Sequence, residues 1–517
     1  MSVESIIVLI ALIGMLMVLI TDKMRPGLTL LSVVIIFMVT GILTPKEMLE
    51  GFSNKGMITV GLLFLISEGI RRSGALSIIV RKVLPTRKVS IRRAQMRLFP
   101  LIYSISLFIN NTPLVVIFAP IIKRWAKVIQ HPATKFLIPL SYVAILGGMC
   151  TLIGSSTNLV VHGMMLESGF EGFTMFELGK VGVFVAIVGM IYLVIFSKRL
   201  LPDTREERAD GVQLPITDLH EVEAVLGPRF PGINKSLNEF DFVRHYGARV
   251  KELRRSGYRF GIEMNDVPLK EGDTLLLLVD DTFIPTWGES SVFMLLSNGK
   301  ENASYYPEHR KRWLALFLLF FMVAGATVGE LPGIKDKLPE GIQLDMFFFA
   351  SITVVIMTWV KLFPLRHYTK YISWDILITI ACALGISKGM VNSGLADEVA
   401  GFMLKISREY GPHALLILIF LFTNLITELI TNNAAAALSF PLALSAANQL
   451  GVNPMPFFVV VCIAASASFS TPIGYQTNLI VQGIGNYKFT DFVKVGLPLN
   501  ILTFIVTIVL VPIIWPF

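Results

Sequence analysis

The feature that most constrains this chain is a set of long apolar runs that contain no charged residue. A membrane-spanning helix needs about 20 mostly apolar residues, and several runs approach that length, so they cannot all be core helices of one soluble domain. The composition agrees, because 16% of the 517 residues are charged, against about 25% in soluble proteins. The sequence therefore predicts an all-α polytopic membrane protein. The runs are Ile6–Ile20, Val181–Ser197, Trp313–Gly329, Phe347–Val360 and Asn500–Phe517.

The distribution of charge predicts how the chain is oriented and divided. The segment Arg71–Arg97 holds nine basic residues and no acidic one, and short loops rich in Lys and Arg stay in the cytoplasm. The polar stretch 198–312 carries 17 basic and 19 acidic residues, so the net charge of +8 resides near the membrane and does not indicate nucleic-acid binding. We expect a multi-pass protein of the inner (plasma) membrane, with a cytoplasmic insert at 201–311 between membrane repeats at 1–200 and 312–517.

Four apolar segments are interrupted by polar residues at their centres. The segment at about 98–130 has basic residues on both flanks, which predicts a re-entrant hairpin that enters and leaves on the cytoplasmic side. The segment at about 412–449 predicts a second hairpin. The segments at about 136–168 and 455–485 predict helices that break within the membrane, the first of them at residues 154–158. Uninterrupted spans are expected at about 3–22, 28–44, 56–71, 176–197, 312–331, 345–361, 374–391 and 490–514.

The motifs of the first half recur in the second half in the same order. Asn110-Asn111-Thr112 is matched by Thr431-Asn432-Asn433, and Thr157-Asn158-Leu159 is matched by Thr477-Asn478-Leu479. A matched span ends inside the cell in the first half and outside in the second. The sequence therefore predicts inverted repeats, an arrangement found in many secondary transporters.

The hairpin tips and helix breaks predict a binding site. Non-helical backbone persists in a membrane only where protein or water covers it, so these segments should line a central cavity. Helix N-termini in such a cavity suit an anion, and exposed carbonyl oxygens suit a small cation. We expect the substrate to contact Asn110, Asn111, Thr112, Ser156, Thr157, Asn432, Asn433, Gln476 and Thr477.

Glu428 is a carboxylate inside the second predicted hairpin. Ionisable groups within a membrane are functional candidates, so Glu428 is a candidate for cation or proton coupling. The alternative is that this side chain caps backbone amides.

At these motifs the chain resembles the divalent anion/Na⁺ symporter family, in its sulfate-permease-like branch. The family's two Ser-Asn-Thr tips correspond to residues 110–112 and 431–433. Neither tip is literally Ser-Asn-Thr, and this departure disfavours a dicarboxylate as the substrate. The matching motifs are Asn110–Pro113, Ile153–Leu159, Thr427–Asn433 and Thr471–Asn478.

The resemblance implies an inverted-repeat scaffold with a transport domain that works by an elevator motion, usually in a homodimer. It implies symport of a small inorganic divalent anion, sulfate, with Na⁺ or H⁺ as the coupling ion and no other cofactor. Each hairpin tip with its facing helix break would hold one Na⁺. The implied cation ligands are Asn111, Ser155, Asn158, Thr431, Asn432, Gly474 and Asn478.

The insert has a sequence pattern of its own. Alternating residues at Val222–Leu226, Ala248–Arg254 and Thr274–Val279 predict strands, and Pro231–Leu237 predicts a short helix. The pattern resembles the TrkA-C-type (RCK C-terminal) α+β domain, at about 218–283. That resemblance implies dimerisation and a small regulatory ligand, with simple reinforcement of a dimer as the alternative.

Other functions remain open on the sequence alone. They are a dicarboxylate carrier of the same family, a cation/proton antiporter that uses Glu428, and an RCK-regulated ion channel. Ile473-Gly474-Tyr475 is similar to part of a potassium filter, but the Thr-Val-Gly-Tyr-Gly string is absent. The sequence contains no nucleotide-binding loop and no nucleophile elbow, so no enzyme is predicted.

Overall fold

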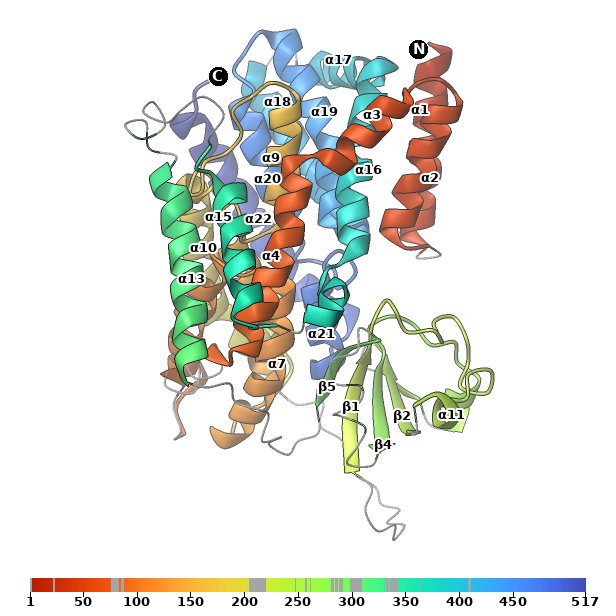
Figure 1. The fold of residues 1–517 in the computed structure, drawn as a ribbon, viewed down its shortest axis with the longest axis vertical. Helices are drawn as coiled ribbons and strands as arrows, with labels where there is room; N and C mark the ends of the chain where they lie inside the picture. Colours follow the sequence, from red (N-terminus) through yellow and green to blue (C-terminus); the bar gives the residue numbers. More distant parts are fainter. Residues whose placement is uncertain are drawn as a thin grey trace.

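The computed structural model shows a bundle of long helices with a small β-sheet at one end (Figure 1). Among the described residues, seven helices are long and apolar enough to cross a membrane, and several shorter apolar helices accompany them. The chain is therefore built as a multi-pass membrane protein. The structure describes residues 2–21, 24–75, 83–84, 88–203, 220–246, 248–255, 258–260, 262–279, 283, 287, 292–297, 309–329, 331, 334, 343–363, 365–407 and 411–517.

The helices form two groups, each of which packs mainly within itself. The first, which we call the framework group, contains six of the eight predicted uninterrupted spans and pairs α2 closely with α16 and α4 with α15. Its members are α1 (Val3–Ile20), α2 (Pro26–Val39), α3 (Pro45–Glu50), α4 (Lys55–Arg72), α13 (His309–Gly329), α15 (Met346–Trp359), α16 (Trp374–Asn392) and α17 (Leu395–Ser407).

The second group, which we call the hairpin group, contains both interrupted regions and the long helices that follow them. The two groups meet where α16 and α17 pack on α19 and where α4 packs on α9. Its members are α6 (Ile91–Ser106), α7 (Asn111–Val128), α8 (Leu137–Gly148), α9 (Ser156–Glu167), α10 (Gly179–Leu200), α18 (Gly411–Leu429), α19 (Asn432–Leu450), α20 (Met455–Ser466), α21 (Gln476–Gly485) and α22 (Phe489–Ile514).

The two predicted hairpins are the helix pairs α6–α7 and α18–α19, which turn at the polar motifs. The first hairpin begins earlier than predicted, at Ile91 instead of about residue 98, so the end of the basic segment is helical. The Ser90 side chain accepts a hydrogen bond from the Arg93 N–H and caps the helix there. In the rest of the basic segment, residues 76–82 and 85–87 lie outside the described residues.

The two predicted broken helices are the pairs α8–α9 and α20–α21. The first break covers residues 149–155, so it lies earlier than the predicted segment 154–158, and Thr157 and Asn158 belong to the first turn of α9. The Ser155 side chain accepts a hydrogen bond from the Thr157 N–H and fixes where α9 begins. The second break covers residues 467–475.

The insert forms a five-stranded antiparallel sheet in the order β3-β2-β4-β1-β5. The three predicted strands are confirmed as β1, β2 and β4, whereas β3 and β5 were not predicted, and β5 lies beyond residue 283. The sheet has its own core of aromatic and aliphatic side chains, separate from that of the helices. The strands are β1 (His220–Leu226), β2 (Arg249–Arg255), β3 (Tyr258–Phe260), β4 (Thr274–Val279) and β5 (Phe293–Ser297).

The helix predicted at Pro231–Leu237 is wrong. The segment is a series of turns in which Asn234 has a φ of 64°. Its backbone pairs with a distant segment, because the Asn234 N–H donates to the Leu269 carbonyl and the Leu269 N–H donates to the Lys235 carbonyl. These groups are therefore committed to long-range contacts that a helix would not allow. The helix found in this region is instead α11 (Phe242–Tyr246).

Candidate functional site

Four helix N-termini meet at the centre of the hairpin group, those of α7, α9, α19 and α21. The Asn111 amide nitrogen at the start of α7 donates to the Tyr475 hydroxyl oxygen, over 3.0 Å, just before α21. The Ser156 hydroxyl at the start of α9 donates to the Asn433 amide oxygen of α19 over 3.1 Å, and the Thr157 hydroxyl lies 3.3 Å from the same atom. Each helix N-terminus carries about half a positive elementary charge, so the junction favours an anion.

The two hairpins are tied to their neighbouring helices by the same hydrogen bonds. In the first hairpin, the Ser106 hydroxyl oxygen lies 2.6 Å from both the Asn111 amide oxygen and the Ala144 carbonyl oxygen. In the second, the Thr427 hydroxyl oxygen lies 2.9 Å from the Asn432 amide oxygen and 2.6 Å from the Ala465 carbonyl oxygen. Each pair of equivalent residues is 321 positions apart. Asn111 and Asn432 are therefore equivalent in their hydrogen bonds as well as in their sequence motifs.

The two helix breaks are closed by equivalent asparagines. The Asn158 amide nitrogen donates across the first break to the Gly148 and Thr151 carbonyls, over 3.0 and 2.8 Å. The Asn478 amide nitrogen donates across the second break to the Ser468 and Thr471 carbonyls, over 2.8 and 3.1 Å. Each side chain thus holds an unwound segment in one shape. The Asn478 amide oxygen accepts a hydrogen bond from the Ser141 hydroxyl over 2.7 Å, whereas the Asn158 amide oxygen has no hydrogen-bond partner among the described residues.

A threonine in each break contacts the end of the facing hairpin helix. In the second half, the Thr471 hydroxyl donates to the Glu428 carbonyl over 2.9 Å and accepts from the Gly474 N–H over 3.3 Å. In the first half, the Thr151 hydroxyl donates to the Leu107 carbonyl and accepts from the Gly154 N–H. Each hairpin tip is therefore fastened to one break.

Oxygen atoms outnumber donors around these tips. The Asn432 amide oxygen contacts three other oxygens, at 2.9 Å from Thr427, 3.2 Å from Gly474 and 3.3 Å from Ala465, and turning the amide would give those atoms a donor. The Asn158 amide oxygen and the Thr431 hydroxyl are buried without a hydrogen-bond partner among the described residues. Neutral oxygens of this kind are the ligands that a small hard cation takes in membrane carriers.

Glu428 differs from the other polar residues because it carries a charge. Its carboxylate accepts four hydrogen bonds, from the N–H groups of residues 469, 470 and 471 at 3.0, 2.8 and 2.8 Å and from the Asn500 amide nitrogen at 2.6 Å. The equivalent position of the first hairpin is Leu107. The carboxylate therefore caps backbone amides of the second break, which is the alternative that the sequence left open.

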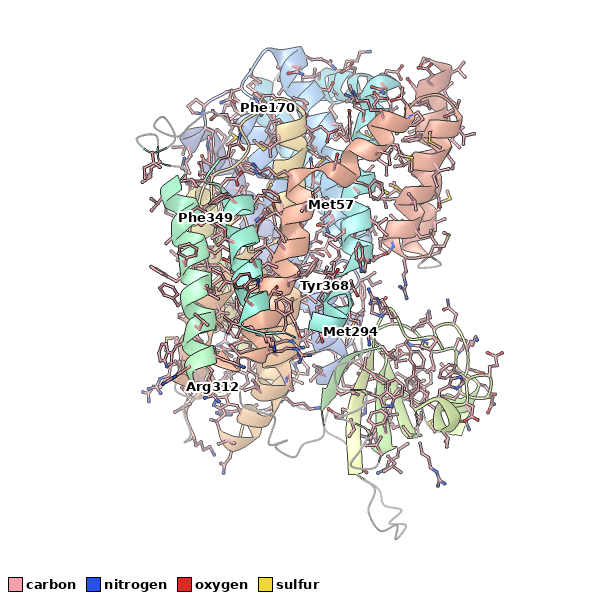
Figure 2. The ribbon with its side chains drawn as sticks, viewed as in Figure 1. Met57, Phe170, Met294, Arg312, Phe349 and Tyr368 are labelled. Carbon is pink, nitrogen blue, oxygen red and sulfur yellow. The ribbon has the colours of Figure 1, made fainter. Side chains whose placement is uncertain are left out.

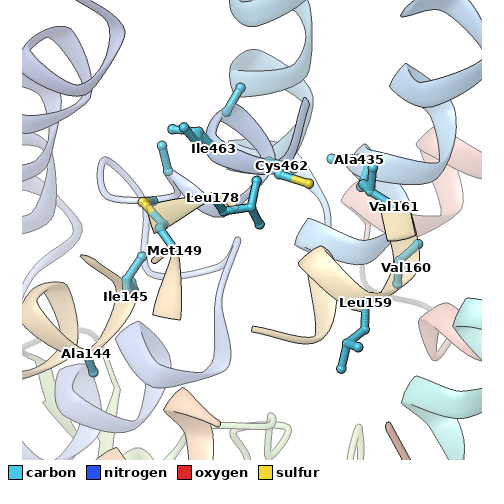
Figure 3. Close-up of a cluster of buried hydrophobic side chains, with 14 of the residues drawn as sticks. Ala144, Ile145, Met149, Leu159, Val160, Val161, Leu178, Ala435, Cys462 and Ile463 are labelled. Atoms are coloured by element: carbon cyan, nitrogen blue, oxygen red, sulfur yellow. The ribbon is translucent and has the colours of Figure 1, made fainter. Parts of the chain in front are cut away.

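Apolar packing closes the site on its other sides. Figure 3 shows Val160 and Val161 of α9 beside Ala435 of α19, where the run of alanines at 434–437 lets the two helices approach. A small pocket lies between α4 and the first tip. Its lining is mainly apolar, with Ser67 and Asn110 as the polar members.

The structure brings most of the predicted residues together. Asn111, Ser155, Ser156, Thr157 and Asn433 link the four helix N-termini. Thr477 lies beside a different pair of residues, because the Ser141 hydroxyl oxygen is 2.9 Å from the Thr477 hydroxyl oxygen and 2.7 Å from the Asn478 amide oxygen. No hydrogen bond of the side chain of Thr112 or of Gln476 is seen among the described residues, although both lie at the starts of their helices.

Sequence reasoning missed several residues of the site. A signal was present, since a hydroxyl residue precedes the tip asparagine by five positions in both halves, and a threonine precedes the break asparagine by seven. Tyr475 and Asn500 have no counterpart of the same type, so the repeat gave no signal for them. The missed residues are Ser106, Ser141, Thr151, Thr427, Thr471, Tyr475 and Asn500.

Comparison with known proteins places the chain among membrane transporters. An uncharacterized transporter of Synechocystis sp. is 30% identical over 94% of this chain and 93% of its own length. Sodium/sulfate cotransporter 1 of Chlamydomonas reinhardtii is 30% identical over 58% of this chain and 33% of its own length. The sodium-dependent dicarboxylate transporter SdcS of Staphylococcus saprophyticus is 21% identical over 95% of this chain and 82% of its own length.

The match to a protein family extends over nearly the whole chain. Residues 16–340 and 334–516 match the family described as citrate transporter. Both interrupted regions, and with them all four helix N-termini of the site, lie inside these matched ranges. The chain therefore belongs to the citrate transporter (CitMHS) family.

Proposed function

We propose that this protein is a secondary active transporter that moves a small inorganic divalent anion, sulfate, coupled to Na⁺ or H⁺. The observation that carries the proposal is the junction of four helix N-termini, flanked by two equivalent sets of neutral oxygens. Such a junction attracts an anion without a fixed basic residue, and the oxygens suit cations that balance its charge. The relatives named as sodium/sulfate cotransporters support both the anion and Na⁺.

The substrate would lie between the tips, in contact with the side chains and N–H groups that begin the four helices. Each Na⁺ would lie between a tip and its fastened break. Asn111, Ser155 and Asn158 would bind the first Na⁺. Four residues would bind the second Na⁺. The second set is Thr431, Asn432, Gly474 and Asn478.

A dicarboxylate is the second candidate substrate. The relative SdcS, which is named as a sodium-dependent dicarboxylate transporter, aligns with 95% of this chain. A dicarboxylate carries its two charges on carboxylates separated by a carbon chain, whereas the charge of sulfate is compact. The two candidates therefore differ in the separation of the charges that the site must hold.

The framework and hairpin groups support an elevator mechanism. Each group packs mainly within itself, so the hairpin group can move as one body with the anion and cations bound. We further propose that the protein is a homodimer and that the insert lies in the cytoplasm as a TrkA-C-type domain with a regulatory ligand. The predicted orientation of the basic segment supports this side for the insert.

The test of function is uptake of radiolabelled sulfate into proteoliposomes, with Na⁺ and H⁺ gradients imposed separately. We expect uptake that follows one gradient and is not inhibited by succinate. Uptake of succinate with no sulfate uptake would select the dicarboxylate carrier. Cation exchange without anion movement would select the antiporter.

The test of the site uses the two tip asparagines. Asn111→Ala and Asn432→Ala should each reduce coupled uptake to background, because each removes the amide oxygen of one cation set. The matched control is Asn448→Ala, an exposed asparagine on the same helix as Asn432, which should transport normally. Normal uptake by both tip variants would show that the tips have a structural role only.

A further inference from the structure

The sheet of the insert touches the hairpin group at two helices. The Lys123 ammonium of α7 donates to both carboxylate oxygens of Glu223 in β1, over 2.9 and 2.7 Å. Met294 of β5 packs against the core of the helices and lies on the side of the sheet that faces the bundle (Figure 2). The sheet is therefore attached to the hairpin that carries Asn111.

The turn before β4 lies directly against α21. A methyl group added at Gly272 would be 2.6 Å from the Leu479 side chain, and one added at Gly483 would be 2.6 Å from the Thr274 hydroxyl oxygen. Contacts this short mean that glycine is needed on both surfaces for the backbones to approach. Leu479 directly follows Asn478, so the insert contacts the helix that carries a predicted cation ligand.

The same insert also touches the framework group, through the loop after β1. The Arg25 guanidinium, directly before α2, donates to the Pro228 carbonyl of this loop. Asp375, in the first turn of α16, accepts a hydrogen bond from the Gly27 N–H over 3.1 Å and is attracted by the charges of Arg25 and Arg229. One carboxylate of the framework thus faces cations from the framework and from the insert.

The two attachments differ in strength. The attachment to the hairpin group combines an ion pair, apolar packing and two close backbone approaches. The attachment to the framework group rests on polar contacts, with the Arg25 side chain exposed, and exposed ion pairs contribute little to stability. If the two groups separate, the framework attachment breaks first.

We propose that the loop at Pro228-Arg229 is a latch between the insert and the framework, which holds the two helix groups in their present arrangement. The proposal rests on the elevator motion given under Proposed function, since a latch restrains only parts that move. The insert travels with the hairpin group through Lys123 and Glu223. Each transport cycle then breaks and remakes the hydrogen bond from Arg25 to Pro228 and the attraction between Arg229 and Asp375.

The latch makes the transport rate adjustable from the insert. Any ligand or partner that shifts the loop at Pro228-Arg229 changes the population of the latched arrangement without touching the substrate site. Exposed polar and charge contacts of this kind change a conformational ratio by about 1.5- to 5-fold. The latch is therefore a modulator of rate and not an absolute lock.

The experiment measures the distance between the groups by paired spin labels at Ile58→Cys on α4 and Phe184→Cys on α10, both exposed positions. The three native cysteines are buried, and labelling of the chain without added cysteines gives the background. We expect two distances in proteoliposomes. Asp375→Asn, which keeps an acceptor for the Gly27 N–H, and Arg229→Gln should each shift their ratio by about 1.5- to 5-fold. Lys405→Gln, an exposed change on α17, should leave the ratio unchanged.

Cross-linking supplies the second arm. A bifunctional thiol reagent joining Arg25→Cys to Arg229→Cys should abolish the second distance, whereas the same reagent joining Lys123→Cys to Glu223→Cys should preserve it. Loss of the second distance with the Lys123–Glu223 cross-link would overturn the assignment of the insert to the hairpin group. A single distance in every variant refutes the movement itself, and two distances in an unchanged ratio refute the latch alone.

Discussion

Replacing Glu428 should lower the free energy of unfolding by an amount that grows with the number of its hydrogen bonds that are lost. Glu428→Leu leaves three backbone N–H groups, those of residues 469–471, without the acceptor that they have now. The Asn500 amide retains the Ser470 hydroxyl as an acceptor, over 2.8 Å. An unsatisfied buried donor costs about 1–3 kcal/mol, so the total is about 3–9 kcal/mol. Residues 470 and 471 are only half-buried. The cost should therefore lie in the lower part of that range.

Glu428→Gln should cost about a third as much. Its carbonyl oxygen can keep the donors that now reach one carboxylate oxygen, and only the Thr471 N–H loses its acceptor. The expected loss is about 1–3 kcal/mol. The removal of a buried charge, whose desolvation is itself unfavourable, offsets part of this loss.

The assay is thermal unfolding of the purified variants in one detergent, together with sulfate uptake across a range of pH. The order of melting temperatures should be wild type, then Glu428→Gln, then Glu428→Leu. Glu177→Gln is the comparison, a half-buried carboxylate just before α10 that accepts its hydrogen bonds from the side chains of Thr174, Lys180 and Trp515 and caps no backbone N–H group of a helix break. Equal melting temperatures for the wild type and Glu428→Leu would refute the capping role. A pH dependence of uptake that disappears in Glu428→Gln would instead identify a proton carrier.

Three further predictions concern the site, the hairpin group and the insert. Ser106→Ala and Thr427→Val each remove one hydroxyl from one of the two equivalent oxygen sets, so each should weaken the apparent Na⁺ affinity of uptake. A weaker affinity in only one of the two variants would show that only one set binds Na⁺. Lys135→Met removes a buried ammonium that donates to two carbonyls at the end of α10, which should cost about 2–6 kcal/mol and lower the melting temperature. Gly483→Val should increase hydrogen exchange in β4 by forcing the insert away, whereas Gly14→Val, where no atom lies within 4 Å of an added Cβ, should not.

The membrane architecture was predictable because its signals are strong and local. Uncharged runs such as Val181–Ser197 can form only buried or lipid-facing helices, and this one is confirmed as α10. The motif around Asn111 interrupts such a run, and the structure turns there. The boundaries were less predictable, because the start of α6 depends on capping by Ser90 and not on hydropathy.

The insert was harder to predict because long-range pairing decides its structure. Pro231–Leu237 has a helical composition in its second part, but its backbone groups bond to Leu269, a partner that local sequence does not identify. The two short helices α3 and α17 were missed for a different reason. They are too short or too amphipathic to give the apolar signal of a span.

One difference between the two halves explains why Glu428 has no counterpart. In the first half, the N–H groups of Met149 and Cys150 still donate to helix carbonyls, because α8 continues to Gly148. In the second half, α20 ends at Ser466. The N–H groups of Ala467 and Ser468 still donate to carbonyls of α20, whereas those of residues 469–471 donate to the Glu428 carboxylate.

The Glu428 carboxylate accepts the N–H groups that have no helical carbonyl in the second half. In the first half, helix carbonyls accept the N–H groups of Met149 and Cys150, so the residue equivalent to Glu428, Leu107, needs no acceptor. The charge therefore follows from the shorter helix and needs no bound ion to explain it. It also means that three amides of the second break already hold an internal anion. A bound substrate anion must then draw its donors from the helix N-termini and the hairpin tips, which is where the two halves agree most closely.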